Sequence, residues 1–592
     1  MKSFDEILYL VEKPARYIGG EFGLPKLKEK YEVASCIVFP DMYEIGMSNL
    51  GIKILYNILN SIEGVICERC FAPWTDMGVQ LKENSIPLMS LESKKSLKDF
   101  DFLGFSIQYE LLFSNVLYIL DLAGIPFRSA DRNNDFPLLI AGGPCSANPE
   151  PFADFFDIIC IGEGEEVVSQ VAEIIKIFKG DRTRILEECA QVEGLYVPSI
   201  HKEAGITSEK IVRKAIVKDL NSSQYPVKPI VPNIPVVHDR PVAELYRGCY
   251  SSCRFCQASF FYRPIRKRSP EVLKKQIIDM IDFSGADEIG ISSLSTGDYP
   301  CLEELFSLIL PEVEKRRVKL QLPSLRLDSF SPELVRNARK TGSLTFAPEA
   351  GTQRLRNVIN KNITDDDIER TVKMAFLSGY KSVKLYFMLG LPSETEEDIL
   401  GIAEIARRIK RIYKEVTNRN DLNINISSSI FVPKPLTPFQ WARQITQQEM
   451  KDKHFLLRKE LKSIKGVNYS WSDENVSLLE CIFARGDKKL SKVIEEAYLM
   501  GAKFDSWNEH FKFDIWKEAF LKHKINYEDY TLEKKLENIL PWSFIDFGVS
   551  DSYLKNEYKK SLLETTTEGC RKECKACGAN RLGKCETLGG ST

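Results

Sequence analysis

The chain has 592 residues, with 81 Lys and Arg, 83 Asp and Glu, and a formal net charge of −2. At about 150 residues per domain this length suggests roughly four compact units, and the balanced charge argues against a histone-like polycation or an acidic tail protein. No apolar run reaches the roughly 18 residues of a membrane span, and Asp5 and Glu6 stand where a secretory signal has a basic start. We therefore expect a soluble, cytoplasmic protein whose clustered Cys serve metal or redox chemistry.

Residues 1–200 alternate apolar strands with helices. Strands are predicted at 33–39, 102–107, 137–143 and 158–165, the last turning into a helix. Continuous apolar strands separated by helices are typical of a parallel sheet covered on both faces. The sequence therefore predicts a Rossmann-like domain whose ligands bind at the glycine-rich carboxyl ends of the strands.

Residues 201–240 form a proline-rich linker that could hold a short hairpin, because proline cannot sit inside a helix. Residues 241–445 contain six strand–helix units. Their strands lie near 242–248, 287–294, 318–324, 343–349, 382–389 and 423–431. Six parallel units predict an open, partial (β/α)6 barrel of the TIM type, with its chemistry at the carboxyl ends of the strands. Residues 446–565 are mainly helical and residues 566–592 form a Cys-rich tail, so the predicted fold class is α/β.

The first cysteine cluster, Cys249, Cys253 and Cys256, follows the first barrel strand with the spacing Cys-x3-Cys-x2-Cys. Three thiolates in one loop can bind three irons of a [4Fe–4S] cube and leave the fourth iron open, whereas a closed zinc site needs a fourth ligand. The basic run at 263–268 is interpreted as a solvated helix entrance, with phosphate or carboxylate contact as the alternative.

The second cluster lies in the tail and comprises Cys570, Cys574, Cys577 and Cys585. Four ligands are enough to close a metal site. Zinc would fold the tail, and a second iron–sulfur cluster could relay electrons or bind substrate; the sequence leaves both open. The basic residues between these Cys would suit an RNA or acidic protein partner, although a solvated surface explains them equally well.

The segment 249–256, with Phe255 before the third Cys, resembles the signature of the radical S-adenosylmethionine (SAM) enzymes. Similar motifs follow in order at the later strand ends. The resemblance implies that Cys249, Cys253 and Cys256 hold a [4Fe–4S] cluster whose open iron binds SAM, and that an electron cleaves SAM to a 5′-deoxyadenosyl radical. It also implies cofactor contacts from Phe255, Thr296, Gly297, Asp298, Ser324, Arg326, Glu349 and Gly390.

The turn Asp41-x-Tyr43-x-x-Gly46 resembles the Asp-x-His-x-x-Gly turn of cobalamin-binding domains, with Tyr in place of the His that ligates cobalt. No His precedes His201. The loops containing Gly142, Gly143, Gly162 and Gly164 resemble the later loops of such domains. Either the domain binds cobalamin without a lower histidine, or it is an inherited sheet that packs on the barrel or binds substrate.

Over nearly its whole length the chain resembles a bacterial group of radical SAM proteins with an N-terminal cobalamin-binding-like domain. The resemblance implies a transferase-type enzyme that carries out cobalamin-associated methylation or a related modification, and it brings no known substrate. The helical extension and the tail suggest an RNA or a protein. It also implies an external electron donor of the flavodoxin or ferredoxin type and no membrane partner. The alternatives are a cobalamin-independent radical SAM enzyme, for sulfur insertion or rearrangement, and a non-catalytic iron–sulfur scaffold or RNA-binding protein. No catalytic residue is assigned beyond the cluster ligands.

Overall fold

The N-terminal domain is built on a six-stranded sheet with the order β2-β1-β3-β4-β5-β6. The structure is a computed structural model and describes residues 2–26, 28–201, 207–321, 344–571, 573–587 and 590–591. The strands of this sheet are β1 (Val33–Phe39), β2 (Val65–Phe71), β3 (Phe102–Ser106), β4 (Leu138–Gly142), β5 (Ile158–Cys160) and β6 (Leu195–Tyr196). All pair in parallel except β6, which runs antiparallel to β5. The predicted Rossmann-like sheet is confirmed, and β2 and β6 are added to it.

Helices cover both faces of this sheet, because successive residues of β1 point to opposite sides and both sides are apolar. One side packs against α3 (Leu50–Ser61), α6 (Glu165–Ile177) and α7 (Arg182–Cys189). The other side packs against α4 (Thr75–Glu83) and α5 (Phe113–Ala123). Two separate apolar cores result, one on each face.

The predicted barrel strands are found as two parallel sheets. One has the order β12-β11-β8 and the other the order β13-β14-β15-β16. Their bounds are β8 (Val242–Glu244), β11 (Glu288–Ser292), β12 (Lys319–Gln321), β13 (Leu344–Glu349), β14 (Ser382–Leu389), β15 (Asn423–Ile430) and β16 (Val467–Trp471). Residues 322–343, which connect the two sheets, lie outside the described residues. The α/β class and the partial barrel are confirmed, and β16 adds a strand within the segment predicted to be mainly helical.

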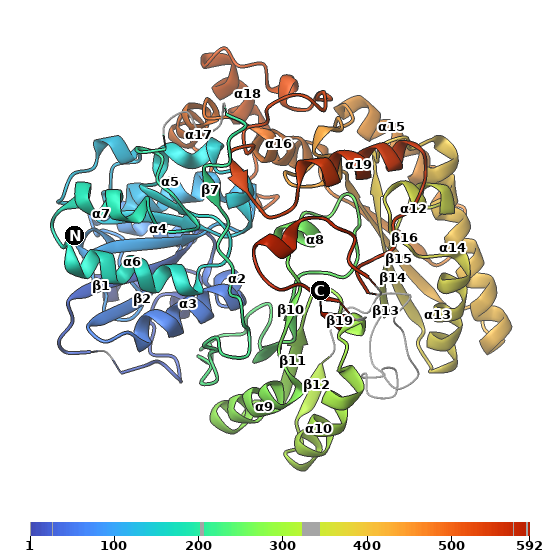
Figure 1. Cartoon of the computed structure of the whole chain (residues 1–592), viewed down its shortest axis with the longest axis horizontal. Coiled ribbons are helices and arrows are strands. Elements are labelled where there is room, and N and C mark those ends of the chain that lie inside the picture. Colours follow the sequence, from blue (N-terminus) through green and yellow to red (C-terminus); the bar gives the residue numbers. More distant parts are fainter. Residues whose placement is uncertain are drawn as a thin grey trace.

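The barrel helices lie outside the strands (Figure 1). They are α9 (Pro270–Ser284), α10 (Leu302–Lys315), α12 (Gln353–Val358), α13 (Asp365–Leu377), α14 (Glu396–Thr417) and α15 (Gln447–Leu461). Ser269 caps α9 by accepting the Val272 N–H, and Pro270 follows at the first helical position, where its fixed φ favours the start of a helix.

Four further helices lie toward the C-terminus: α16 (Glu474–Arg485), α17 (Leu490–Leu499), α18 (Phe513–Lys522) and α19 (Asp551–Leu562). Buried side chains of α16 and α17 belong to the same apolar core as α5, so this region packs against the N-terminal domain. The Cys-rich tail then returns to the middle of the molecule, beside α8 (Gln257–Phe261) (Figure 1). In the part of the chain that the structure describes, no helix has the length and apolar character to cross a membrane.

The linker forms no hairpin among its described residues. Instead β7 (Val212–Arg213) pairs in parallel with β17 (Ile545–Asp546), a strand more than 300 residues later. Isolated bridges also join Phe22 to Val231 and Gly162 to Ala215. The linker is therefore held by segments near both ends of the chain and by the turn after β5.

Candidate functional site

The loop with the first three Cys runs from β9 (Tyr246–Arg247) to α8 at the mouth of the barrel. Cys249 and Cys253 are buried and Cys256 is partly exposed. The Cys256 N–H donates to the Cys253 carbonyl oxygen at 3.1 Å, which closes the loop into a tight turn. Gly248 allows the chain to enter this turn because its φ is +92°. The loop thus lies where the sequence predicted it.

Buried polar contacts fix this loop to the rest of the chain. The Arg254 guanidinium, which is 0 % exposed, pairs with Glu557 of α19 at 3.0 Å. It also donates to the Val358 carbonyl oxygen at 2.9 Å, and the Arg254 N–H donates to the Ile359 carbonyl oxygen at the same distance. A buried ion pair with additional hydrogen bonds holds its partners in one geometry. The loop is therefore pre-organised by α12 and α19.

The thiols of this loop suit an iron–sulfur cluster chemically. Burial raises the pKa of the Cys256 thiol, and the neighbouring Cys253 raises it further. Thiols must lose their protons to bind a metal, so cluster binding would release protons and offset this cost. Among the described residues, no three Cys, His, Asp or Glu side chains are arranged to hold a single metal ion. The chemistry of the donor set, three thiols in one short loop, nevertheless fits the cube predicted from the spacing.

Three of the predicted SAM-binding segments lie near this loop or at strand ends of the barrel. Thr296, Gly297 and Asp298 form a short 3-10 turn after β11, in which the Thr296 and Asp298 side chains are buried. Glu349 ends β13 with a φ of +68°, and Lys361 pairs with it at 3.0 Å. The same ammonium lies 6.0 Å from the ring centroid of Phe255, so it links Glu349 to the cluster loop.

Gly390 follows β14, and its N–H donates to Glu394 at 2.9 Å. A Cβ at this position would come within 2.7 Å of the Ile445 side chain, so glycine is needed for packing as well as for its φ of +81°. Ser324 and Arg326, the predicted contacts after the third strand, lie outside the described residues.

A cavity of about 420 Å³ lies between the N-terminal sheet and the barrel. Its wall on the side of the N-terminal domain contains all four glycines predicted at the later loops: Gly142, Gly143, Gly162 and Gly164. Its wall on the barrel side contains Arg247 and Gly248, which immediately precede Cys249. The cavity therefore connects the predicted cobalamin loops with the start of the cluster loop.

The three predicted residues of the first turn do not line this cavity, although Asn49, Leu50 and Gly51 shortly after them do. The Tyr43 hydroxyl donates to Glu21 at 3.0 Å, and Asp41 accepts from the Trp507 indole N–H at 3.1 Å. At Gly46 an added Cβ would lie 2.3 Å from the Phe71 ring. Asp41, Tyr43 and Gly46 are thus engaged in packing, away from the cavity that the other predicted residues line.

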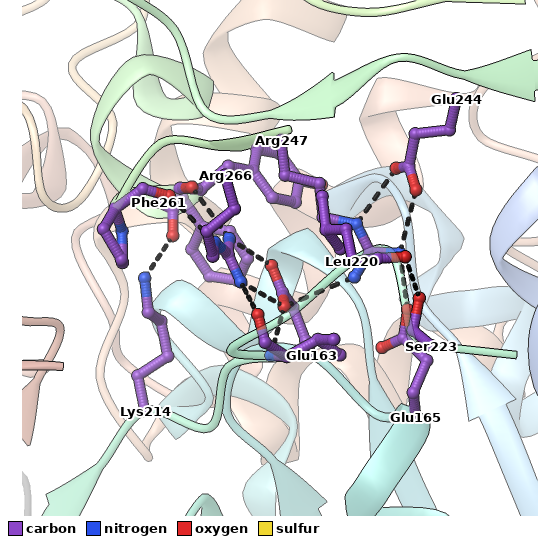
Figure 2. A network of polar contacts seen from close by, with 12 residues as sticks. Glu163, Glu165, Lys214, Leu220, Ser223, Glu244, Arg247, Phe261 and Arg266 are labelled. Carbon is purple, nitrogen blue, oxygen red and sulfur yellow. Dashed lines mark hydrogen bonds and ion pairs between the residues drawn. The ribbon is translucent and has the colours of Figure 1, made fainter. Parts of the chain in front are cut away.

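An ion-pair network between the two domains, shown in Figure 2, was not predicted. The Glu163 carboxylate accepts two hydrogen bonds from Arg266, each of 2.7 Å, and lies 3.3 Å from Arg247. Arg247 also pairs with Glu165 at 2.5 Å. Because Arg247 and Arg266 are paired neighbours on β9 and β10 (Arg266–Lys267), two like charges lie side by side and Glu163 compensates both. The network joins the Gly162–Glu165 turn to the strand that leads into the cluster loop.

This network overturns the interpretation of the basic run as a solvated helix entrance. Arg263, Arg266 and Arg268 are buried, with exposed fractions of 2 %, 2 % and 0 %. Arg266 and Arg268 pair with carboxylates of the protein itself, Glu163 and Glu244. These contacts are internal to the protein, and contact of the run with a ligand's phosphate or carboxylate stays a prediction. The sequence contained one signal of this network: the run Glu163-Gly164-Glu165 is acidic and lies in a glycine-rich turn.

The four Cys of the tail lie beside the first loop. Cys570 and Cys577 are buried, Cys585 is partly exposed and Cys574 is exposed. The Cys570 N–H donates to the carbonyl oxygen of Tyr250, the residue after Cys249, at 2.7 Å. The structure thus brings together two cysteine clusters that are more than 300 residues apart in the chain.

Comparison with known proteins agrees with this description. Residues 51–198 match the family of radical SAM proteins, N-terminal, and residues 243–406 match the radical SAM superfamily. The second match contains Cys249, Cys253 and Cys256. The fold and the three-cysteine loop define an iron–sulfur enzyme built on a partial barrel. The chain belongs to the radical SAM superfamily, whose members use a [4Fe–4S] cluster and SAM.

The individual relatives have low sequence identity to this chain. An uncharacterised protein of Methanocaldococcus jannaschii is 28 % identical over 462 residues, which is 78 % of this chain and 90 % of that protein. The anaerobic magnesium-protoporphyrin IX monomethyl ester cyclase of Cereibacter sphaeroides is 24 % identical over 42 % of this chain and 40 % of its own length. The tRNA-2-methylthio-N(6)-dimethylallyladenosine synthase of Lachnoclostridium phytofermentans is 26 % identical over 27 % of this chain and 38 % of its own length.

Among solved structures, the radical SAM methyltransferase TsrM from Kitasatospora setae, with cobalamin and a [4Fe–4S] cluster bound, is 14 % identical with a TM-score of 0.46. The match covers 67 % of this chain and 74 % of that one.

Proposed function

We propose that this enzyme cleaves SAM reductively at the Cys249–Cys256 loop and uses cobalamin, held by the N-terminal domain, to methylate or otherwise modify its substrate. One observation carries the proposal: a single cavity is lined both by the four predicted cobalamin-loop glycines and by Arg247 and Gly248 at the start of the cluster loop. A cofactor in this cavity would face the barrel mouth, where the radical forms.

The lining of the cavity suits a partly apolar ligand. Its walls come from α3 and α6 on one side and from the sheet on the other, with Leu55, Val171 and Ile140 among the lining residues. Glycines at the strand ends let the backbone approach such a ligand closely. When bound, cobalamin supplies a carrier for a methyl group.

The predicted first turn of this domain would offer cobalamin no histidine. Tyr43 is directed toward Glu21 and lies outside the cavity, and none of the described residues that line the cavity is a His. His201, the first His of the chain, accepts the Val197 N–H at 3.0 Å and stacks on Tyr196. The described residues of the cavity would therefore hold cobalamin without a histidine.

The residues of the barrel have separate tasks in this proposal. Cys249, Cys253 and Cys256 hold the cluster, and the turn at Thr296–Asp298 offers hydroxyl and carboxylate groups to the polar end of SAM. Lys361 keeps Glu349 in place at the end of β13. The buried contacts of Arg254 exclude water from the back of the loop. The electron comes from an external donor of the flavodoxin or ferredoxin type, and we expect an RNA or protein substrate.

The cleavage step is tested by anaerobic reconstitution with iron and sulfide, followed by dithionite and SAM. We expect 5′-deoxyadenosine from the native chain and none from Cys253→Ala. Cys189→Ala, a buried cysteine of α7 in the N-terminal domain, is the matched control and should retain product formation. Absence of deoxyadenosine from the native chain would leave only the scaffold or RNA-binding function.

The cobalamin step is tested by the absorption spectrum of the protein incubated with hydroxocobalamin and desalted. Gly142→Leu is designed to fill the cavity, because a Cβ added there meets only the Cys160 Cβ, at 3.6 Å. We expect this variant to lose the cobalamin band and to keep the iron content of the native protein. A native protein that cleaves SAM but takes up no cobalamin would instead support the cobalamin-independent alternative, sulfur insertion or rearrangement.

A further inference from the structure

The Cys-rich tail is folded directly onto the cluster loop. Beyond the hydrogen bond from Cys570 to Tyr250, a Cβ on Gly569 would lie 2.5 Å from the Tyr250 carbonyl oxygen, so only glycine allows this approach. The Glu586 N–H donates to the Ile265 carbonyl oxygen at 3.0 Å, just after α8. The tail therefore contacts the barrel mouth at both of its ends (Figure 1).

Side chains add two further connections between the tail and the site. Asn360 donates to the Ser252 carbonyl oxygen at 3.0 Å and accepts the Thr567 N–H at 2.7 Å, so one side chain bridges the two segments. Arg571 forms an ion pair with Asp298 of the predicted SAM-binding turn. The tail is thus part of the wall around the site.

The backbone around Cys574 and Cys577 is tightly bent. Ala576, between the two Cys, and Gly578, after the second, both have positive φ, +52° and +96°. The Ala576 N–H donates to the Cys574 sulfur at 3.4 Å. Backbone hydrogen bonds to sulfur stabilise thiolates and tune the clusters they hold.

Arg263 supplies a buried positive charge at the same place. Its guanidinium donates to the Ser252 hydroxyl at 2.8 Å and lies 4.9 Å from the Phe260 ring centroid. Among the described residues it forms no ion pair with a carboxylate. Burying a cation costs stability unless an anion compensates it, and a cluster held by four thiolates would supply that negative charge beside Arg263.

The spacing distinguishes the two metals that the sequence left open. Cys570-x3-Cys574-x2-Cys577 repeats the spacing of Cys249-x3-Cys253-x2-Cys256, and Cys585 adds a distant fourth ligand. In the ferredoxin pattern for [4Fe–4S], three ligands come from one short run and the fourth comes from elsewhere in the chain. Structural zinc sites usually combine two separate Cys-x2-4-Cys pairs. With four thiolates no iron is left open, so such a cluster would not bind SAM.

We propose that Cys570, Cys574, Cys577 and Cys585 hold a second, closed [4Fe–4S] cluster that passes electrons to the first one. In each transfer the reduced tail cluster loses one electron and the oxidised cluster at Cys249, Cys253 and Cys256 gains it. A ferredoxin- or flavodoxin-type protein then replaces the electron. The Cys570–Tyr250 hydrogen bond joins the two ligand loops directly. The relay role rests on the proposed function, but the presence of the cluster does not.

The cluster is tested in the full chain carrying Cys249→Ala, Cys253→Ala and Cys256→Ala together. After anaerobic reconstitution we expect about four iron and four sulfide per chain, and an electron paramagnetic resonance signal upon reduction that does not change when SAM is added. Stoichiometric zinc, or no metal, would overturn the proposal. If this variant does not fold, the complementary Cys574→Ser, Cys577→Ser variant should lose half of the native iron. Full iron content in that variant would also overturn it.

The relay is tested by the ratio of two rates of deoxyadenosine formation, with reduced flavodoxin and with dithionite as donor. We expect Cys574→Ser to lower this ratio several-fold, because the small reductant does not depend on the protein route. Equal loss with both donors would mean that the tail is only structural and would overturn the relay. Arg263→Gln should also shift the midpoint potential of the tail cluster to a more negative value, with Arg263→Lys closer to the native value. An unchanged potential in Arg263→Gln would contradict the assigned charge contact.

Discussion

Glu163→Gln tests whether the network in Figure 2 fixes the cluster loop to the N-terminal domain. Burial alone would raise the pKa of Glu163, but Arg266 and Arg247 outweigh it and lower the pKa from 4.5 to about 2. At about 1.4 kcal/mol per pKa unit, this corresponds to about 3 kcal/mol of stability at neutral pH. Gln removes the carboxylate that pairs with Arg266, while Arg247 keeps Glu165 and Glu244. The cost of breaking a buried pair, about 3–5 kcal/mol, is the closest comparison for Arg266.

The assay is urea unfolding of the full chain, compared by midpoint because a chain with several domains need not unfold in a single step. Glu404→Gln is the matched control. Glu404 lies 3.5 Å from Arg407 on the exposed side of α14, where an ion pair contributes about 0–1 kcal/mol. We expect a clearly lower midpoint for Glu163→Gln than for Glu404→Gln at pH 7.

The pH dependence gives an independent check of the same reasoning. Because the folded pKa of Glu163 lies below 4.5, its stabilisation is complete above that pH and is lost as the pH falls from 4.5 toward about 2. The difference between the native chain and Glu163→Gln should therefore be constant from pH 7 down to about 5 and decrease below that range. Equal midpoints for Glu163→Gln and Glu404→Gln at pH 7 would refute the role assigned to the network.

Two further predictions concern other buried groups. Burial raises the pKa of Asp505 from 3.8 to about 6, so ionising Asp505 lowers the stability by an amount that is zero below pH 3.8 and reaches about 3 kcal/mol above pH 6. Asp505→Asn should therefore raise the melting temperature at pH 8 but not at pH 4. An equal rise at both pH values would argue against burial as the cause. Gly162→Ala should destabilise the chain more than Gly180→Ala: both have positive φ, but the added Cβ meets the Ala215 carbonyl oxygen at 2.3 Å in the first case and nothing within 4 Å in the second. Equal melting temperatures for the two variants would show that the backbone at Gly162 shifts enough to accommodate the added Cβ.

The six barrel strands and most of the N-terminal sheet could be predicted because their apolar runs are local signals. Strand β2 was missed because Glu68 and Arg69 interrupt its pattern. The Arg69 side chain is buried there only because Glu21 and Glu92, at 2.9 Å and 2.7 Å, compensate its charge from distant parts of the chain. Such pairings have no local trace in a single sequence.

The same limit applies to the site. The position of the three-cysteine loop at the barrel mouth could be predicted because it directly follows the first barrel strand, and the glycines of the later loops do line one cavity. The turn at Asp41, Tyr43 and Gly46 has a familiar spacing, but Trp507, Glu21 and Phe71 decide where its side chains lie. The contact between the tail and the cluster loop joins residues about 320 positions apart and could not be inferred from either segment.

The parallel pairing of β7 with β17 has a consequence for how the protein is made. A ribosome releases residues 212–213 long before residues 545–546 exist, so the linker strand emerges without its partner. An unpaired strand edge is prone to pair with other chains. During synthesis this edge therefore stays without its partner until Ile545 and Asp546 have been made, and a fragment ending before Ile545 would leave it unpaired.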